Sequence, residues 1–255
     1  MQLQLSYNVK TVRPSYWQLG SNILYGNRFT LQIGNPFLRP SIIHDASLSG
    51  SWKFMQLMVS YKQEKDMIIQ WAEQLEDNPA VTLLSTKNIY NIPSLSLFLS
   101  ASPKFGIWSP QASVGFIKQW LKITSNNREI TMNNLMPIAS LNNSFSLPND
   151  FLVTFDANFQ GKGSTQNVEI VNNKFVLNLG VTKSFLHDRL SISLKGHDLL
   201  FYNKNDILLY NNKLLLSQFS KWDTRELEIT VRYKFNTNGS RYKGTGAGES
   251  EFNRL

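Results

Sequence analysis

The sequence predicts an all-β fold, an antiparallel up-and-down transmembrane β-barrel portion of about ten strands, and two observations lead to this prediction. Over much of residues 175–235, apolar and polar residues alternate, and strict alternation gives extended strands with two different faces. Short and long connections also take turns along the chain, as in outer-membrane barrels with short periplasmic turns and longer outer loops. A soluble β-sandwich shares the alternation but lacks this two-sided difference, so we favour the barrel.

The composition suits a surface that contacts lipid on one side and water on the other. Only 17% of the 255 residues are charged, below the quarter or so that is usual in soluble domains. The length is enough for one sizeable barrel or two small domains. No stretch approaches the ~18 consecutive apolar residues of a membrane-spanning helix, so we expect any membrane insertion to use strands.

The charge balance does not indicate a nucleic-acid partner. A net charge of +8 would fit nucleic acid or an anionic membrane surface, but the basic residues are scattered singly and are not interleaved with stacking aromatics.

The absence of cysteine excludes disulfide frameworks and thiolate metal sites. The first residues lack the basic head and apolar run of a signal peptide, so we expect an exported chain with this start to be incomplete or processed.

Strand character begins almost at the first residue, because apolar residues occupy the odd positions from 3 to 9. Residues 13–40, with their prolines and glycines, predict a long connection. A strand follows at about 41–53. The apolar parity flips between Phe54 and Leu57, which is typical of a tight hairpin whose two arms each keep a period of two.

The same alternation of short and long connections continues to the end of the chain. A polar segment at 62–87 predicts a long connection, followed by a strand at 89–101. Tight turns are expected near 102–106, 148–150 and 187–189, and long connections near 122–137, 160–174 and 198–223. The closing strand at 227–235 ends in two aromatic residues, where an interfacial girdle is expected. Short periplasmic turns would place both termini in the periplasm.

Residues 65–76 allow two interpretations. Ile68, Trp71, Ala72 and Leu75 would share one face of an amphipathic helix. The interpretation that we favour is the end of a strand followed by an outer loop.

No pattern identifies a catalytic, cofactor-binding or metal site, so we predict that the protein is not an enzyme and has no cofactor. His44, His187 and His197 are far apart and lack the HExxH-type spacing of a metal site. A Ser-His-Asp set could be assembled from the many serines, but nothing in the spacing selects one. The glycine-rich residues 244–248 lack the Lys-Ser/Thr and the helix of a phosphate-binding loop, so we interpret them as a flexible tail.

Two further groups of residues could face the barrel lumen or a ligand. Glu226, Glu228 and Arg232 fall on one face of the last strand and predict charge pairing in a water-filled lumen. Several aromatic residues of the long connections could stack on a sugar or another flat ligand, namely Tyr16, Trp17, Tyr25, Trp71, Phe201, Tyr202 and Tyr210. We interpret each of them first as a girdle or loop-packing residue, and none is assigned as a binding residue.

The chain resembles a known family in several blocks that occur in the same order. Residues 12–19 (VRPSYWQL) and 34–40 (GNPFLRP) resemble the RPxxxxL…GNPxLxP block of TonB-dependent outer-membrane receptors. Similarity to the closing strands of these receptors lies at 179–190 (LGVTKSFLHDRL), 222–225 (WDTR) and 233–236 (YKFN). The tail at 242–255 resembles the ending of the Bacteroidetes-type outer-membrane β-barrel branch.

The resemblance implies a barrel that in complete members has 22 strands, encloses an N-terminal plug and imports a ligand with energy relayed by TonB. None of the 255 residues resembles the plug, the TonB box or the carboxypeptidase-like leading domain of these receptors, so we expect this sequence to be only the C-terminal part of such a receptor. We therefore expect residues 1–236 to form the C-terminal part of the barrel and residues 237–255 to form a periplasmic tail. Each orphan amide or carbonyl in hydrocarbon costs several kcal/mol, so the isolated chain is expected to be an open, aggregation-prone sheet.

The resulting hypothesis is the C-terminal barrel part of a TonB-dependent receptor of the cell outer membrane. Its expected partners are outer-membrane lipid, the remaining barrel strands, the plug, the TonB complex acting through the plug, and a small ligand such as a siderophore, glycan or peptide. One alternative is a self-closed small barrel that acts as a pore or adhesin. Another is an outer-membrane hydrolase with a Ser-His pair in the barrel wall.

Overall fold

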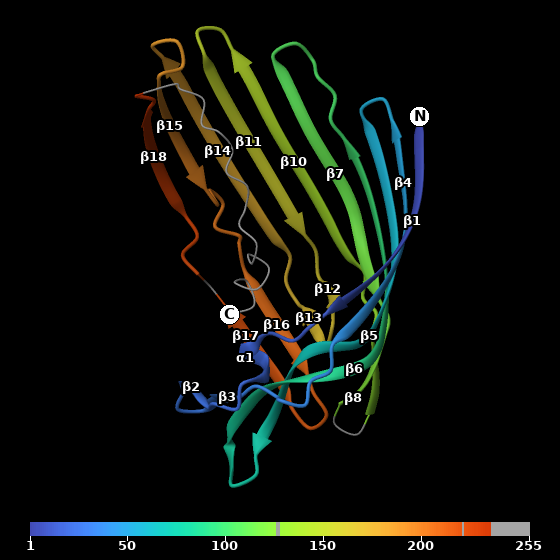
Figure 1. Ribbon diagram of the computed structural model, residues 1–255. Coiled ribbons are helices and arrows are strands. Elements are labelled where there is room, and N and C mark those ends of the chain that lie inside the picture. Colours follow the sequence, from blue (N-terminus) through green and yellow to red (C-terminus); the bar gives the residue numbers. More distant parts are fainter. Residues whose placement is uncertain (126–127, 221, 236–255) are drawn as a thin grey trace.

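The computed structural model describes residues 1–125, 128–220 and 222–235. Ten long strands follow one another across the largest sheet, and every neighbouring pair along this path is antiparallel (Figure 1). In order they are β1 (Gln2–Val12), β4 (Ser41–Trp52), β5 (Met55–Leu75), β6 (Asn78–Ala101), β7 (Trp108–Gln119), β10 (Met136–Leu147), β11 (Phe151–Gln160), β14 (Lys174–Phe185), β15 (Leu190–His197) and β18 (Glu226–Tyr233). The prediction of about ten antiparallel strands is confirmed. The predicted tail at 237–255 lies outside the described residues.

The remaining elements are short and occupy the connections. They are α1 (Tyr16–Leu19), β2 (Leu24–Asn27), β3 (Thr30–Gln32), β8 (Leu121–Ser125), β9 (Arg128–Met132), β12 (Gly163–Thr165), β13 (Val168–Ile170), β16 (Asn205–Tyr210) and β17 (Leu215–Ser220). Strands β12, β13, β16 and β17 form a second sheet, β8 and β9 form a hairpin, and β3 pairs in parallel with β6. No helix in the described part of the chain is long and apolar enough to cross a membrane.

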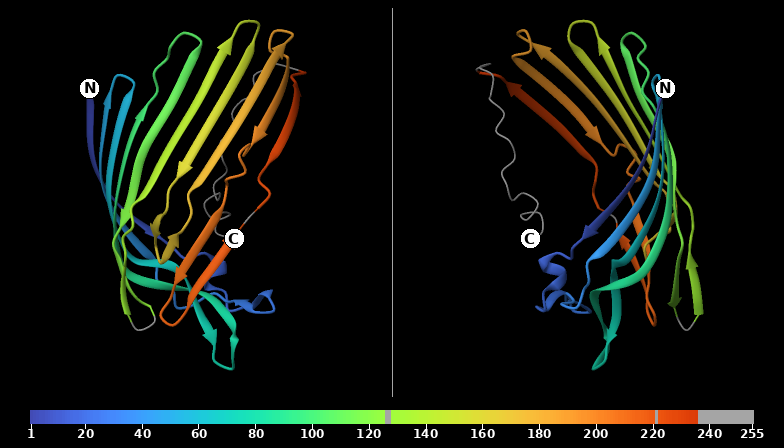
Figure 2. Two further views of the ribbon diagram at one scale, coloured as in Figure 1. Left: turned by 180° about the vertical axis from the view of Figure 1, so that it is seen from behind. Right: turned by 45° about the vertical axis from the view of Figure 1, so that its right-hand side comes forward.

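The two ends of the large sheet differ in their connections. Short turns join β4 to β5, β6 to β7, β10 to β11 and β14 to β15, and they lie at the end that also holds the N-terminus (Figures 1 and 2). We call this end the turn end. The short elements gather at the opposite end, which we call the loop end. The short and long connections that alternate along the sequence therefore lie at opposite ends of the sheet.

The sheet is an open, curved wall (Figure 2). Within the described residues, β1 pairs with β4 alone and β18 with β15 alone, so each of these strands has one edge without a neighbour. This arrangement agrees with the expected open sheet.

The tight turns are built from residues with positive φ. Asn149 and Asp150 have φ values of 60° and 59°, and Leu186, His187 and Asp188 lie between 54° and 63°. Asn and Asp tolerate this left-handed region because their short side chains bond locally. Leucine does so at a cost, which the pairing of the two long strands on either side offsets.

The prediction of a long connection at 62–87 is wrong. Strand β5 continues to Leu75 and β6 begins at Asn78, so this part of the chain is a long two-stranded hairpin. Residues 65–75 belong to β5, so the helix interpretation is wrong. Of the favoured interpretation, the strand is confirmed, but the outer loop that was expected to follow it within residues 65–76 is not found. The outer part of this hairpin extends beyond the neighbouring strands of the large sheet. Outside the membrane the strict alternation of a membrane strand is no longer required, so the polar composition of these residues suggested a loop.

The large sheet has one apolar and one polar face. Val153, Val181, Leu194 and Ile229 lie opposite one another on four neighbouring strands, and Leu194 is 46% exposed. Exposed apolar rows of this length are unusual for a surface in water and are typical of one that meets lipid. The other face carries hydroxyl pairs, such as the Thr182 hydroxyl that donates to Ser193 at 2.9 Å.

The apolar face has the height of a membrane. Residues 175–185 of β14, at about 3.3 Å per residue and a tilt of about 40°, span about 25 Å. Aromatic residues with bonded polar tips occur along this face. The Tyr7 hydroxyl lies 2.8 Å from a ring nitrogen of His44, and toward the turn end the Trp108 indole donates to Asn143 at 3.0 Å. Such rings suit a boundary between lipid and water.

Candidate functional site

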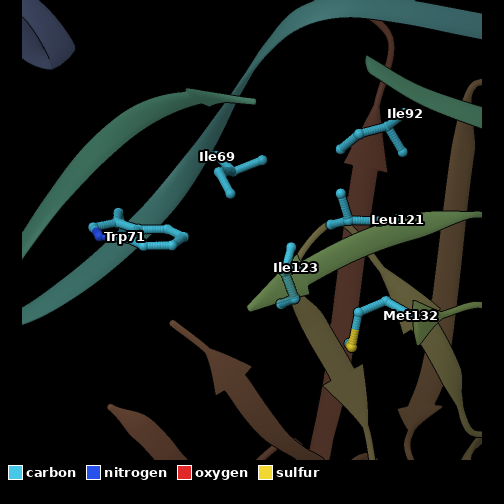
Figure 3. Close-up of a cluster of buried hydrophobic side chains, with 6 residues drawn as sticks. All are labelled: Ile69, Trp71, Ile92, Leu121, Ile123 and Met132. Carbon is cyan, nitrogen blue, oxygen red and sulfur yellow. The ribbon is translucent and has the colours of Figure 1, made fainter. Parts of the chain in front are cut away.

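The long connections fold onto one another at the loop end and share an apolar core. Figure 3 shows its buried members, which we call the loop-end core: Ile69, Trp71, Ile92, Leu121, Ile123 and Met132. They come from β5, β6, β8 and β9, and each is at most 8% exposed. Burial of each such side chain contributes roughly 1.5–3 kcal/mol, so the loop end is a folded unit with defined positions.

A bend directs the β5–β6 hairpin across the loop end (Figure 1). At the bend, Asp66 has a φ of 53°, and the ladder between β5 and β6 skips it. The Arg39 guanidinium lies 2.7 Å from the Asp66 carboxylate. The Asn88 side chain donates to the carbonyls of Arg39 and Asp66 and accepts from the Arg39 amide. One asparagine therefore ties the bend to the incoming segment.

The segment between β1 and β4 is docked on this hairpin through backbone contacts. Ser15 begins α1 with a capping box in which its hydroxyl accepts from the Gln18 amide at 3.2 Å. Gly34 packs so closely against α1 that a Cβ there would lie 2.5 Å from the Gly20 carbonyl oxygen. The neighbouring Asn35 amide donates to the Gln18 carbonyl at 2.6 Å, and its side chain donates to the Thr86 carbonyl at 3.0 Å. The two halves of the RPxxxxL…GNPxLxP block thus hold each other.

Buried asparagines supply the free edge of β5 with hydrogen bonds. Asn167 and Asn211 are fully buried. The Asn167 side chain donates through Nδ2 to the backbone carbonyl of Gln70 at 2.9 Å, and the Asn211 side-chain Oδ1 accepts from the backbone amide of Ala72 at 3.0 Å. A buried backbone group without a partner costs free energy, and here side chains take the place of a neighbouring strand.

A carboxylate joins three further connections at the loop end. Glu169 accepts from the Tyr210 hydroxyl at 2.9 Å and from the Asn134 side chain at 2.8 Å. Burial, this hydrogen bond and the negative charge of Glu169 raise the pKa of the Tyr210 phenol above its ordinary value of 10.0. The contact therefore keeps Tyr210 protonated and acting as a donor.

A hollow of about 250 Å³ lies between α1, β3, β5 and β6, and we call it the loop-end hollow. Its lining is neutral and includes Trp17 and the glutamines Gln18, Gln32, Gln70 and Gln166. Trp17 also lines an adjoining hollow of about 210 Å³. Amide side chains both donate and accept hydrogen bonds, and an indole ring offers a flat apolar face. This chemistry suits a neutral, polar ligand.

The aromatic residues considered from the sequence have different positions. Trp71 belongs to the loop-end core, and Tyr210 is bonded to Glu169. Tyr16 and Trp17 line the adjoining hollow, and Tyr25 is 82% exposed on the β2–β3 hairpin.

Phe201 and Tyr202 lie in the connection that follows β15, not in the one that contains α1. Each has a cation over its ring. The Arg225 guanidinium lies 4.1 Å from the Phe201 ring centroid, and the Lys204 ammonium lies 5.1 Å from that of Tyr202. Both contacts are internal to the loop end. Of the seven aromatic residues, Tyr16 and Trp17 are therefore the pair that the structure brings together beside a hollow.

The three histidines lie at separate places, His44 on β4, His187 in the turn between β14 and β15, and His197 at the end of β15. The His44 ring is bonded to Tyr7, and His197 lies 3.6 Å from the Glu228 carboxylate. In the described part of the chain, no cluster of His, Asp and Glu could hold a metal ion.

Glu226, Glu228 and Arg232 lie at alternate positions of β18 and share one of its faces, as predicted. Glu228 stands opposite Lys195 in the strand register and close to His197. Arg232 stands opposite Ser191 and not beside a glutamate. In the described part of the chain, Arg232 has no carboxylate within ion-pair distance, and the contact of Glu228 is with His197 of the neighbouring strand at 3.6 Å.

Sequence reasoning missed the residues that build the loop end. Asn88, Asn167 and Asn211 are ordinary asparagines of the long connections and hairpins, and no local pattern distinguishes them from exposed ones. Gly34 and Asn35 carried a signal through the family resemblance, but their contacts with α1 and β6 depend on the fold.

Comparison with known proteins gives two results. The model of the outer membrane protein beta-barrel family matches residues 1–233. Among solved structures, the outer membrane transporter YddB from Escherichia coli is similar, with a TM-score of 0.49 and 10% sequence identity, over 80% of this chain and 34% of that chain. This chain therefore spans about a third of the length of that transporter. No curated protein matches the chain.

Proposed function

The chain belongs to the outer membrane protein beta-barrel family, and we propose that it is the C-terminal barrel part of a TonB-dependent receptor that takes up a small ligand. The observation that carries the proposal is the loop end, where the long connections pack around a neutral hollow. A passive wall needs no such folded connections. A receptor needs them, because a binding site requires side chains in fixed positions.

The open edges of the sheet support the role of a barrel part. Backbone groups on the outer edges of β1 and β18 have no strand partner in the described chain, and such groups cost several kcal/mol each in hydrocarbon. Additional strands that pair with both edges would remove this cost. The proposed partners are therefore the remaining barrel strands, a plug inside them, and the TonB complex acting through the plug.

The proposed orientation places the loop end outside the cell and the turn end in the periplasm. Long outer loops and short periplasmic turns are the rule in bacterial barrels. In this orientation the hollow beside Tyr16 and Trp17 meets incoming ligand, and the polar face lines the path inward. The proposed ligand is a siderophore, glycan or peptide.

The proposal is tested by uptake in cells that carry the complete gene. We expect labelled solutes of one of these three classes to accumulate in cells with the gene and TonB, and not in cells that lack either. A Trp17→Ala variant should reduce uptake about fivefold, because one aromatic stacking contact contributes roughly 1 kcal/mol. Tyr25→Ala, which alters an exposed aromatic residue of the same segment outside both hollows, is the matched control and should leave uptake unchanged.

Uptake that is the same with and without TonB would contradict the proposal and would indicate a passive pore. Equal uptake by the Trp17→Ala and Tyr25→Ala variants would contradict the assignment of the hollow.

A further inference from the structure

We propose that the turn end binds the phosphate groups of anionic phospholipids through a basic rim, formed by Lys53, Lys104, Lys183, Arg189 and Lys234. The proposal concerns the leaflet that the turn end meets and does not depend on which ligand is transported. It rests on the orientation proposed above, with the turn end on the periplasmic side.

Basic residues are spread around the rim from one edge of the sheet toward the other. Lys53 lies in the turn between β4 and β5, Lys104 between β6 and β7, and Arg189 between β14 and β15. Lys234 directly follows β18, and its amide donates to the Arg189 carbonyl at 2.8 Å. These turns lie at one end of the wall (Figure 2), so a single layer of lipid headgroups would meet all of them.

Lys183 supplies the charge at the β10–β11 turn from within the apolar face. It stands opposite Phe151 on one side and Ile192 on the other, in a row that meets lipid. Its ammonium lies 4.0 Å from the Phe151 ring centroid and donates to the Asn149 carbonyl in the turn. The side chain thus runs along the apolar surface and brings its charge to the headgroup depth.

The rim charges are not neutralised by neighbouring carboxylates. In the short turns the acidic residues are Asp150 and Asp188. Among residues 1–125, 128–220 and 222–235, no carboxylate lies within ion-pair distance of any rim residue. An excess of basic groups at one depth attracts anionic headgroups.

Two cations of the loop end have carboxylate partners, since Arg39 is paired with Asp66 at 2.7 Å and Lys122 with Glu129 at 3.1 Å. In the described part of the chain, none of the five rim cations has such a partner. The ammonium of Lys53 also lies 5.1 Å from the Trp52 ring centroid, and tryptophan favours the headgroup layer in which phosphates lie.

The test measures lipid retention by the full-length protein encoded by the complete gene, purified from outer membranes in a neutral detergent. Native mass spectrometry counts bound phosphatidylglycerol, phosphatidylcholine or lipopolysaccharide after each is added at the same ratio. We expect phosphatidylglycerol to be retained in preference to the other two. The triple variant Lys53→Gln, Lys104→Gln, Arg189→Gln should weaken its retention about a hundredfold, because each basic residue near an anionic surface contributes roughly a fivefold effect and the three effects multiply.

The matched control removes three exposed basic residues of the loop end, in the triple variant Arg28→Gln, Lys162→Gln, Lys213→Gln. It should retain phosphatidylglycerol as the unmodified protein does. Both variants are checked for an unchanged unfolding temperature, since the substituted side chains are exposed.

Four results would overturn the proposal. They are equal retention of phosphatidylglycerol and phosphatidylcholine, equal losses in the two triple variants, preference for lipopolysaccharide, and displacement of the lipid by millimolar inorganic phosphate. Preference for lipopolysaccharide would also reverse the proposed orientation. The other three would leave the proposed transport function unaffected, so the two failures are distinguishable.

Discussion

At the scale of single residues, the packing of the loop end has positions at which adding a single side-chain atom would cause a clash. Gly34 is the clearest case, because three backbone carbonyl oxygens of residues 17–20 lie within 2.6 Å of where its Cβ would be. Backbone atoms held by the α1 capping box cannot move aside as the end of a flexible side chain could. This glycine is therefore required by a close approach and not by its φ angle.

Gly34→Ala should detach the segment before β4 from α1. We expect a loss of about 1–3 kcal/mol in the stability of this contact, as for overpacking in a well-packed core. Limited proteolysis should show faster cleavage within residues 20–40. The control is Gly26→Ala in the same segment, where a Cβ would meet Thr30 at an ordinary 3.4 Å. Equal cleavage of the two variants would show that the Gly34 contact is unimportant.

Tyr210 provides a pH-dependent prediction at the same scale. Burial, the hydrogen bond to Glu169 and the charge of that carboxylate raise the pKa of the phenol above 10.0. The folded protein holds this proton to higher pH than the unfolded chain does. The contribution to stability is therefore complete below about pH 10 and is lost as the pH rises through the higher folded pKa.

Glu169→Gln should lower the pKa of Tyr210 toward its ordinary value, because it removes the negative charge and weakens the acceptor. Tyrosinate absorbance during an alkaline titration, with Tyr210→Phe as the blank, measures this pKa. An unchanged titration in the Glu169→Gln variant would contradict the assigned cause.

At the scale of elements, the β5–β6 hairpin is the unit that gives the loop end its shape. Its membrane part continues the sheet, whereas its outer part turns at Asp66 and carries Ile69 and Trp71 into the loop-end core. The local sequence could not predict this bend. On one side of it the two strands belong to the membrane wall, and on the other side they pack against the loop-end core. The bend is fixed by residues distant in sequence, through Arg39 and Asn88.

Asn88→Ala should loosen the bend, because it removes the donor that holds the carbonyls of both Arg39 and Asp66. We expect a loss of about 1–2 kcal/mol in the local opening free energy, as for a hydrogen-bonded group of partial burial. Hydrogen exchange should rise in residues 67–87 and stay constant in the membrane part of β5. Tyr90→Ala, at a 76% exposed neighbouring site, is the control. Exchange that rises equally in both variants would contradict this role.

At the scale of the whole molecule, the two faces of the wall have opposite requirements. Leu194 belongs to the row that meets lipid, whereas Lys195, the next residue, faces polar neighbours and stands opposite Glu228. Charge on one face is therefore costly, and charge on the other is ordinary. The difference between the two faces is what the assignment as a membrane barrel predicts.

Leu194→Arg should destabilise the protein in vesicles by about 2–4 kcal/mol, the cost of a basic side chain near the bilayer midplane on the lipid face. Asn158→Arg, on the polar face of β11, should change stability by less than about 1 kcal/mol. Urea unfolding of the full-length protein in lipid vesicles measures both. Similar losses for the two variants would contradict the assignment of faces.

The sequence by itself determined the strands of the sheet, because a period of two and a change of parity at each tight turn are local properties of a chain that meets lipid on one face. It also located the four short turns and the block at 34–40. Only the tertiary structure decided that the connection predicted at 62–87 is a bent hairpin, that Asn167 and Asn211 complete the edge of β5, and that Trp71 is buried while Trp17 is exposed beside a hollow. These outcomes depend on contacts between segments far apart in the chain. The partner of each polar group comes from a distant segment, so the neighbouring residues in the sequence do not reveal it.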